Sequence, residues 1–486
     1  MALASPLAVA AIAHTSDALT RGAMLTISQT PYSRALPPDF IGLSLEYTTL
    51  RAYAGPNPRR INPLLIALIR DLAPAPSIRF GGDSTDWAWT PTPSIAEPPG
   101  IRLTITRDWL RTARGLAQAT NARLILGVNF EANSRAVAAT EARALTGALG
   151  TSRVAALELG NEPELYSSFG WYQTPAGESI PGRPPSWNGT SLDRDFARIG
   201  TALPRLPIAG PAIGGQQWIG YTTPFIDAER RLSVVTLHRY PLWRCHLPSS
   251  SPLYATLPHL LEPTASRGLA DSVIRYARLA HIRNMPLRID EINSVSCGGV
   301  RGISDTFASA LWTLDTLFEL ARVGVDGVNF HTFAGAAYAP FSFTRRHRVW
   351  RASVKPEYYA MLMFNRADPA GASLLRIDGR TPNSVHAWAT QSRNGTTQLV
   401  VINESARPRL ITTKGPGNSS KAMLERLTAP GLRAGDGTKL AGQSFPAHTS
   451  TAQPTGPRMT STIKPEDGVY AISLPGASAA LLTLKR

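Results

Sequence analysis

Two glutamates stand where a short apolar run gives way to polar residues. Glu162 lies in the segment LELGNEPELY, and Glu291 lies in PLRIDEINSVSCGG. Because Pro163 has no N–H to donate to a strand ladder, we expect a strand to end at Asn161 and Glu162 to project from it. Two carboxyl groups on either side of one anomeric carbon are what hydrolysis of a glycosidic bond requires.

The elements that would position these residues follow a regular order. Between residues 40 and 365, short apolar runs alternate with helical patterns, which is typical of βα units around a parallel sheet. The predicted strands are 40–47, 77–82, 122–130, 154–161, 207–213, 232–240, 286–293 and 325–333, and the predicted helices are 63–72, 107–119, 135–149, 192–203, 264–283 and 305–323. Eight such units predict a (β/α)₈ barrel. A doubly wound sheet is disfavoured because no GxGxxG follows the first strand.

In a barrel of this kind, functional side chains sit at the carboxyl ends of the strands. The predicted strand ends carry Glu46, Asp83, Asn129, Asn161, Glu162, Gln216, His238, Tyr240, Glu291, Asn293 and His331. Glu162 ends the fourth strand and Glu291 ends the seventh, and these two strands lie across the barrel from each other. An ion pair with an arginine is the alternative for either glutamate alone. Together they predict a catalytic pair.

The flanking segments differ from the barrel domain predicted at 37–365. Beyond it, alternating segments such as SVHAWATQ and TQLVVIN predict an all-β sandwich domain at 366–486, with a long loop at 429–465. A strand at 23–29, within the N-terminal segment 1–36, is expected to join that β domain. The apolar start MALASPLAVAAIA resembles the core of a secretory signal without its basic leader. It predicts an exported protein, periplasmic or extracellular.

Composition excludes several classes of function. The 486 residues carry a formal net charge of +16 and are 43% hydrophobic, which is enough for a large core. The arginines are spread without a run of five or six basic residues, which argues against a nucleic-acid partner. The longest apolar stretch is shorter than the roughly 20 residues of a membrane span. The absence of CxxC and HExxH spacings, together with the two-carboxyl chemistry, predicts neither a metal nor an organic cofactor.

Several motifs resemble those of one enzyme family. The Asn-Glu-Pro end of strand four and the glutamate of strand seven resemble the retaining glycosidases of clan A. The segments IGLSLEY, SIRFGGDSTD, TLHRYP, DEINSVSCGG and HTFAGAAYAPF resemble glycoside hydrolase family 79, which holds β-glucuronidases and heparanase-like enzymes. The resemblance covers the barrel and the trailing β domain. It implies a retaining β-glucuronidase that acts on a β-glucuronide or another uronic-acid-containing saccharide.

The same resemblance implies roles for the matched residues. Glu291 would be the nucleophile, Glu162 the general acid/base, and Asn161 the ligand of the sugar 2-hydroxyl. Glu46 and Asp83 match positions that bind ring hydroxyls. The alternative for these last two is an ion pair with a barrel arginine such as that of SIRFGG.

Recognition of the uronate is implied by the loop after strand seven. Gly298 and Gly299, after Cys297, match a loop whose backbone N–H groups bind the substrate carboxylate, and Tyr338 matches an assisting tyrosine. Glycines let the backbone approach an anion closely, although such a dipeptide is also an ordinary turn. Ser296 departs from the family pattern, because some bacterial members carry a tyrosine there.

Two further strand-end residues, Tyr240 and His238, match the surroundings of the catalytic pair. The tyrosine is expected near the nucleophile and the histidine beside the acid/base. Alternatively, both side chains could simply fill the upper barrel.

The two cysteines lie in loops that the barrel would bring together. Cys245 lies five residues past Tyr240, and Cys297 lies six residues past Glu291. Loops after adjacent strands lie side by side, so a disulfide between Cys245 and Cys297 is predicted, in agreement with export. Two unrelated buried thiols are the alternative.

Two other functions stay open on the sequence alone. The first is a clan A β-glycosidase for a neutral sugar, such as a β-glucosidase or β-xylosidase. The second is a non-catalytic carbohydrate-binding protein, against which the paired glutamates argue, because binding needs no paired carboxylates.

Overall fold

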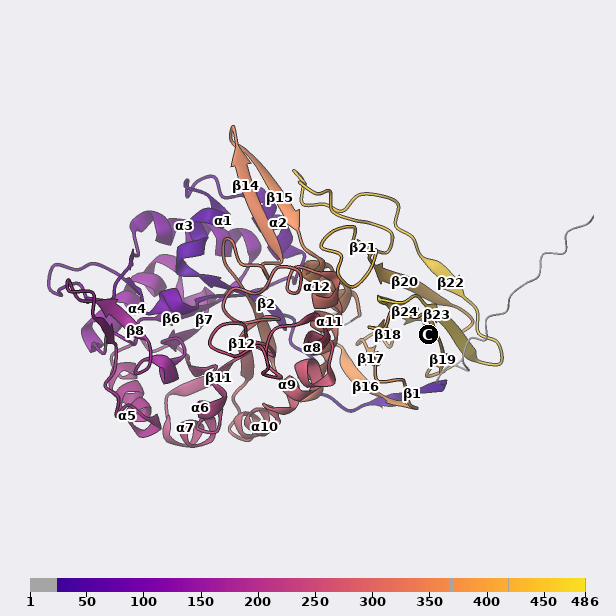
Figure 1. Ribbon diagram of the computed structural model, residues 1–486, viewed down its shortest axis with the longest axis horizontal. Helices are drawn as coiled ribbons and strands as arrows, with labels where there is room; N and C mark the ends of the chain where they lie inside the picture. The colour runs from indigo at the N-terminus through magenta and orange to yellow at the C-terminus, as the bar shows by residue number, and fades with distance from the viewer. Residues whose placement is uncertain (1–23, 368–370, 418, 486) are drawn as a thin grey trace, which may run out of the picture.

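The computed structural model describes residues 24–367, 371–417 and 419–485. The signal-like start of the chain lies outside these residues. Two bodies of structure make up the described chain, a barrel surrounded by helices and an all-β region beside it (Figure 1).

Eight parallel strands close into a barrel, as the sequence predicts. They are β2 (Ile41–Glu46), β3 (Ser77–Gly81), β6 (Arg123–Val128), β7 (Val154–Leu159), β10 (Ile208–Ile213), β11 (Leu232–Arg239), β12 (Leu287–Ile292) and β13 (Gly327–Thr332). The ring closes where β13 pairs with β2. Every residue of β2, β12 and β13 is buried, because the barrel interior and the helix layer cover both faces.

Helices surround the barrel (Figure 1). They are α1 (Leu50–Ala54), α2 (Pro63–Arg70), α3 (Arg107–Thr120), α4 (Arg135–Leu149), α5 (Gly189–Gly200), α6 (Gln216–Ile219), α7 (Thr222–Ala228), α8 (Leu257–Leu260), α9 (Leu269–Asp271), α10 (Ile274–Ile282), α11 (Phe307–Arg322) and α12 (Pro356–Ala367). Side-chain caps at Thr106, Ser134 and Asn188 accept N–H bonds and set where α3, α4 and α5 begin. The helix predicted at 264–283 is divided into a π-helical turn (Thr264–Gly268), α9 and α10.

The all-β region is one ten-stranded sheet. Its strands are β1 (Met24–Pro31), β16 (Ser373–Asp378), β17 (Val385–Gln391), β18 (Thr397–Asn403), β19 (Arg409–Lys414), β20 (Ala422–Thr428), β21 (Lys439–Leu440), β22 (Ser461–Ile463), β23 (Val469–Leu474) and β24 (Ser478–Leu484). The N-terminal strand β1 lies between β16 and β19. Leu424 of β20 and Ile472 of β23, from opposite ends of the sheet, belong to the same buried core. The sheet therefore curves over its own core.

Helix α11 joins the two bodies. It is buried along almost its whole length, because one side faces the barrel and the other faces the sheet. Asp315 accepts a hydrogen bond of 2.9 Å from the indole N–H of Trp388 on β17, and the Phe318 ring stacks on the same indole at 5.7 Å. These contacts hold the β region against the barrel.

Three two-stranded pieces lie outside the barrel and the large sheet. They are the pair β4 (Ala88–Trp89) and β5 (Leu103–Thr104), the pair β8 (Gly170–Gln173) and β9 (Ser179–Pro181), and the hairpin β14 (Phe341–Arg346) and β15 (Val349–Val354). The last pair projects from the body of the molecule (Figure 1). Within the described ranges, no helix has the length and apolar character needed to cross a bilayer.

Candidate active site

The predicted catalytic glutamates meet at the carboxyl end of the barrel. Carboxylate oxygens of Glu162 and Glu291 lie within 4.8 Å of each other. Retaining glycosidases hold their two carboxyl groups about 5–5.5 Å apart, and inverting enzymes about 6.5–9.5 Å apart. Oxygens this close fit direct attack by one carboxylate on the sugar, as in the retaining arrangement.

The backbone presents Glu162 from an unusual conformation. Its φ is +47°, a left-handed value that costs a non-glycine residue free energy. The Glu162 N–H donates to Ala212 O at 3.0 Å, and Glu162 O accepts from Leu165 N at 2.9 Å. These two bonds, together with the turn that Pro163 begins, aim the side chain into the mouth of the barrel, where it is 21% exposed.

A buried arginine holds the nucleophile candidate. The Arg79 side chain has no exposed surface, and its Nη1 lies 2.6 Å from Glu291 Oε2. Its Nε lies 2.6 Å from Glu158 Oε2 and 3.1 Å from Asp290 Oδ2. One guanidinium thus serves three carboxyl groups from two other strands, which fixes the position of Glu291 in the barrel.

The surroundings of Glu291 favour its ionised form. Burial alone would raise the pKa of this carboxyl, but the positive charges of His331 and Arg79 lower it. The Tyr240 O–H also donates to Glu291 Oε1 at 2.9 Å. The net effect holds the pKa of Glu291 below its ordinary range, so the carboxylate is available to attack.

Glu162 has the opposite electrostatic environment. Burial, followed by the negative charge of Glu291, raises the pKa of Glu162 to about 8. His238 Nε2 lies 3.1 Å from Arg79 Nη2, and since arginine only donates, this nitrogen must accept. Burial also lowers the pKa of His238, so its proton sits on Nδ1, which donates to Glu162 Oε1 at 3.1 Å. At neutral pH Glu162 carries a proton that the second oxygen can deliver.

Glu46 is anchored by backbone and histidine, not by arginine. It accepts hydrogen bonds from the N–H groups of Asp83 at 3.1 Å and Ser84 at 2.9 Å. His331 Nε2 lies 3.4 Å from Glu46 Oε1. The alternative of an ion pair with Arg79 is wrong for Glu46, because that guanidinium is occupied inside the barrel.

Asn161 and Asp83 lie together beside the glutamates. Asn161 Oδ1 accepts from Arg79 Nη2 at 3.0 Å, and its Nδ2 donates to Asp83 Oδ1 at 3.3 Å. The Asn161 N–H donates to Asp86 Oδ2 at 3.0 Å, which fixes the backbone there. The ion pair considered as an alternative for Asp83 is likewise not formed within the described chain. Both polar side chains remain near the carboxylates that would flank a sugar.

The glycine loop meets Tyr338 at the far side of Glu291. Gly298 and Gly299 have φ values of +83° and +80°, and a Cβ on Gly299 would lie 2.9 Å from the Tyr338 ring. Gly298 O accepts from Ala337 N at 2.7 Å. Within the described residues, the Gly298 N–H has no acceptor. The Tyr338 ring is buried, 6.3 Å from the ring of Tyr240.

The two cysteines form a disulfide, Cys245–Cys297, with their Cα atoms 6.4 Å apart. The loops that carry them run side by side: Leu242 bridges Val295, and the Ser296 N–H donates to Leu242 O at 2.9 Å. The bond therefore ties the loop after β11 to the loop that contains the glycines.

Some strand-end residues do not reach this site. Asn129 donates to the backbone oxygens of Asp86 and Ala88, Asn293 donates to His331 O, and Gln216 begins the exposed helix α6. Each amide stabilises a loop or faces solvent.

Arg79 and His331 make more contacts with the acidic groups of the site than their positions in the sequence indicate. The sequence suggests Arg79 only as a partner for Glu46 or Asp83, and His331 only as a strand-end residue. An arginine between Ile78 and Phe80 in a fully buried strand needs acidic partners inside the barrel, which is the signal that could have identified it.

One group of three described residues has the spacing of metal ligands, namely Glu162, His238 and Glu291. Arg79 lies 2.6 Å from one of these carboxylates and 3.1 Å from the histidine. A cation here would meet a buried guanidinium, so the arrangement suits proton transfer better than metal binding.

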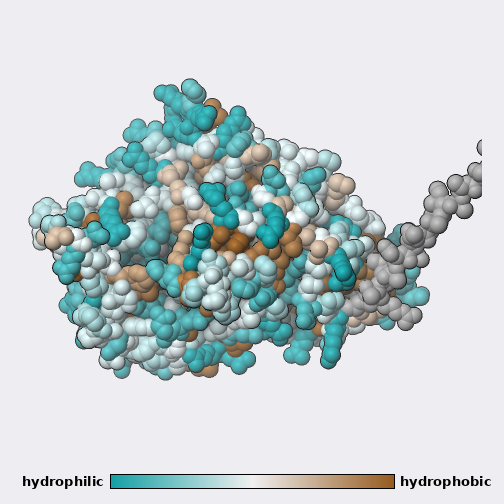
Figure 2. Space-filling view, viewed as in Figure 1, coloured by the Kyte–Doolittle hydropathy of each residue, from teal (hydrophilic) through white to brown (hydrophobic). Residues whose placement is uncertain are grey.

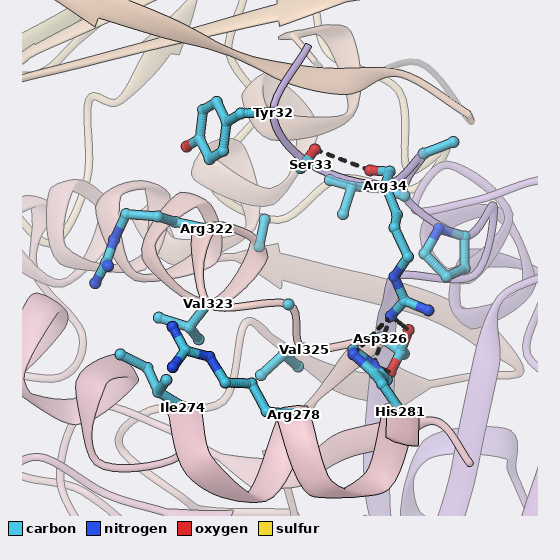
Figure 3. Close-up of a pocket in the computed structure, with 15 residues that line it drawn as sticks. Tyr32, Ser33, Arg34, Ile274, Arg278, His281, Arg322, Val323, Val325 and Asp326 are labelled. Carbon is cyan, nitrogen blue, oxygen red and sulfur yellow. Dashed lines mark hydrogen bonds and ion pairs between the residues drawn. The ribbon is translucent and has the colours of Figure 1, made fainter. Parts of the chain in front are cut away.

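A cavity of about 250 Å³ lies at the opposite end of the barrel, beside the start of β13 (Figure 3). On one wall Arg34, His281 and Asp326 point toward one another. Asp326 lies 2.7 Å from Arg34 Nη2 and 2.8 Å from His281 Nε2, and it accepts from the Leu287 N–H at 2.9 Å. Its carboxylate is saturated, and this cavity is not the catalytic site.

Comparisons with known proteins agree with this geometry. Residues 381–481 match the glycosyl hydrolase family 79 C-terminal beta domain. A β-glucuronidase from Neurospora crassa is 24% identical over 433 residues, covering 78% of this chain and 74% of that protein. A β-glucuronidase from Aspergillus niger is also 24% identical, over 93% and 92% of the two chains.

A solved structure extends the agreement to the fold. The 4-O-α-L-rhamnosyl-β-D-glucuronidase from Fusarium oxysporum superposes with a TM-score of 0.73 at 20% identity, covering 95% of this chain and 100% of that one. The β region thus matches a family 79 domain, the chain is similar over most of its length to two β-glucuronidases, and the barrel has the fold of a solved glycosidase: the comparisons identify a glycoside hydrolase that is similar to family 79.

Proposed function

We propose that this glycoside hydrolase is a retaining β-glucuronidase with Glu291 as nucleophile and Glu162 as general acid/base. The observation that carries the proposal is the pair itself: oxygens within 4.8 Å, with pKa values displaced in opposite directions. Carboxyl groups whose environments separate their pKa values in this way divide the acid and nucleophile roles.

In the first step, ionised Glu291 attacks the anomeric carbon. The bond to the leaving oxygen breaks as Glu162 donates its proton to that oxygen. Arg79 and Tyr240 hold the attacking carboxylate, and Asn161 lies where it can bond the sugar 2-hydroxyl. The products of this step are a glycosyl ester on Glu291 and a free alcohol.

In the second step, Glu162 acts as a base. Esterification removes the negative charge of Glu291, and with it one cause of the raised pKa of Glu162. The ionised Glu162 then takes a proton from water, the oxygen attacks the anomeric carbon, and the bond to Glu291 breaks. Two inversions restore the original anomeric configuration.

The substrate carboxylate is assigned to the glycine loop. The Gly298 N–H is free within the described chain, the positive φ values open the backbone, and Tyr338 packs against Gly299 beside Glu291. Backbone amides of this kind bind anions without a lysine or arginine. The similar fungal proteins are β-glucuronidases, which supports a glucuronide as the substrate.

A panel of 4-nitrophenyl glycosides tests the proposal. We expect kcat/KM for the β-glucuronide to exceed that for the β-glucoside and β-xyloside by at least about tenfold, since a lost charged hydrogen bond costs roughly 1.5–3 kcal/mol. Equal rates on glucuronide and glucoside would instead favour a neutral-sugar β-glycosidase. Binding without hydrolysis of any member would favour a carbohydrate-binding protein.

We also propose that the protein is exported. The Cys245–Cys297 disulfide supports this, because such bonds persist mainly in oxidising compartments. Cell fractionation with an antibody to the folded chain tests it; protein confined to the reducing cytosol would contradict it.

A further inference from the structure

Asp86 carries a buried carboxyl group that takes no part in the two proposed steps. Hydrophilic side chains cover the tip of the β14–β15 hairpin where it projects from the molecule (Figure 2), but Asp86, in the segment after β3, is only 2% exposed. A carboxyl group removed from water in this way needs hydrogen-bond donors inside the protein. The donors around Asp86 therefore show what it holds in place.

The two carboxyl oxygens of Asp86 accept hydrogen bonds from two other segments. Oδ1 accepts from the N–H groups of Phe130 at 2.8 Å and Glu131 at 3.0 Å, after β6. Oδ2 accepts from the Asn161 N–H at 3.0 Å and from the Tyr166 O–H at 2.6 Å, after β7. Asp86 thus joins the ends of three neighbouring barrel strands, β3, β6 and β7. Because both oxygens are occupied, its part is to hold the backbone and not to contact a substrate.

The bond from Asn161 lies in the middle of a constrained turn. Gly160 and Glu162, on either side, have φ values of +79° and +47°. Their N–H groups donate to backbone oxygens of the strands next to β7, each at 3.0 Å. The Asn161 N–H between them instead meets side chains, Asp86 Oδ2 at 3.0 Å and Tyr166 Oη at 3.1 Å. A left-handed non-glycine residue persists only where its surroundings hold it, and this middle bond is the part that a side-chain substitution removes.

Tyr166 reinforces the same turn. Its hydroxyl donates to Asp86, and it lies so close to Gly160 that a Cβ there would overlap with it. The ring itself is buried, 6.1 Å from the ring of Phe130. Asp86 and Tyr166 therefore form one support beneath the residue that precedes Glu162.

We propose that Asp86, supported by Tyr166, is a positioning residue that holds the turn at Asn161 so that Glu162 can deliver its proton to the leaving oxygen. The inference rests on the proposed function, which makes Glu162 the general acid/base. A displacement of about 1 Å in a positioned group can cost about 10²-fold in rate. Loss of the Asp86 bond should therefore act most strongly on substrates whose leaving group needs the proton.

The experiment compares kcat/KM of Asp86→Asn and its parent on methyl β-D-glucuronide and 4-nitrophenyl β-D-glucuronide. An amide nitrogen donates and cannot accept. The Tyr166 hydroxyl can turn and accept, whereas the backbone N–H groups beside Oδ1 cannot, so the amide nitrogen should take the place of Oδ2. The Asn161 N–H then loses this acceptor. We expect the ratio of methyl to 4-nitrophenyl kcat/KM to fall at least about tenfold, or 1.4 kcal/mol.

A matched control and a second variant accompany this change. Asp315 of α11 is also a fully buried carboxyl group, and it accepts from the Trp388 indole at the junction with the β region. Asp315→Asn should lower stability but leave the ratio within about twofold, because a general loss of stability affects both substrates alike. Tyr166→Phe keeps the ring and removes only the hydroxyl, so it should lower the ratio by about threefold. It decides the question if Asp86→Asn does not fold.

Glu162→Ala separates this inference from the proposed function. If Glu162→Ala depends on the leaving group while Asp86→Asn, or Tyr166→Phe in its place, leaves the ratio unchanged, the positioning role is overturned and the catalytic assignment stands. If Glu162→Ala shows no such dependence, the catalytic assignment fails, and the positioning role fails with it.

Discussion

The two ends of the barrel both carry arginine, histidine and carboxylate, but they balance these charges differently. At the amino-terminal end, Asp326 alone receives Arg34, His281 and a backbone N–H. At the carboxyl-terminal end, one buried guanidinium, that of Arg79, is shared by three carboxyl groups. At the amino-terminal end, several donors share one carboxylate. At the carboxyl-terminal end, several carboxyl groups share one guanidinium.

This difference explains why only one end is suited to chemistry. A carboxylate such as that of Asp326, whose oxygens are occupied by an arginine, a histidine and a backbone N–H, fixes the start of a strand. Where carboxyl groups outnumber cations in a buried space, they cannot all be ionised, so one keeps a proton. The pKa values of Glu162 and Glu291 move apart for this reason.

The largest expected effect is a loss of turnover. It should follow removal of a carboxylate charge at the carboxyl-terminal end of the barrel and not removal of one at the amino-terminal end. Glu291→Gln should reduce kcat on 4-nitrophenyl β-D-glucuronide by at least about 10⁴-fold, because an amide cannot form the glycosyl ester. Asp326→Asn, a matched change at the other end, should leave kcat within about twofold. Initial rates with active-site titration check this, and near-normal turnover by the Glu291 variant would contradict the assignment.

Loss of the acid/base should depend on the leaving group. Glu162→Ala should lower kcat/KM for an alkyl β-glucuronide by about 10²–10⁴-fold, but much less for substrates whose leaving group needs no proton. Added azide should restore the rate on the 4-nitrophenyl substrate by attacking the glycosyl enzyme in place of water. If azide had no effect and no glycosyl azide formed, Glu162 would not be the acid/base.

The pH profile should report the raised pKa of Glu162. The active form needs Glu162 protonated, so kcat/KM should fall as pH rises through about 8, tenfold for each further unit. The acid limb of the profile reports ionisation of Glu291. It should lie below the ordinary carboxyl range, because the pKa of Glu291 is lowered. In Glu162→Ala with azide, the alkaline limb should disappear. If it persisted, it would belong to another group, such as His331.

Recognition of the substrate carboxylate should be separable from catalysis by Glu162 and Glu291. Tyr338→Phe should lower the ratio of glucuronide to glucoside kcat/KM by about tenfold, because one hydrogen bond to a charged group is lost. Rates on the two 4-nitrophenyl substrates provide the measurement. An equal loss on both would place Tyr338 in general support of Tyr240 instead.

The smallest effect is expected at the opposite end of the barrel. Asp326→Asn should lower the free energy of unfolding by roughly 1 kcal/mol, since its ion pairs are partly exposed and solvent screens them. Urea denaturation measures this loss. A large loss of activity without a loss of stability would remove the distinction between the two ends.

The barrel and the positions of its catalytic candidates follow from the order of residues along the chain. Apolar runs and helical periodicity are local signals, so the eight predicted strands match β2 to β13 within one or two residues at most ends. Strand ends in a parallel barrel face one side, which is why the pattern of residues alone places Glu162, Glu291 and the two cysteine loops together.

Which side chains share the site depends instead on contacts across the folded barrel. Arg79 meets Glu291, Asp290 and Glu158 in the barrel interior, a contact among strands far apart in the chain that no local pattern encodes. Asn129 stands at an equally suitable strand end, but its amide donates to the backbone of the segment after β3. Gly55 packs on the Trp350 ring, although these residues are almost 300 positions apart in the sequence. The direction of each side chain depends on packing against distant partners, and packing exists only once the chain has folded.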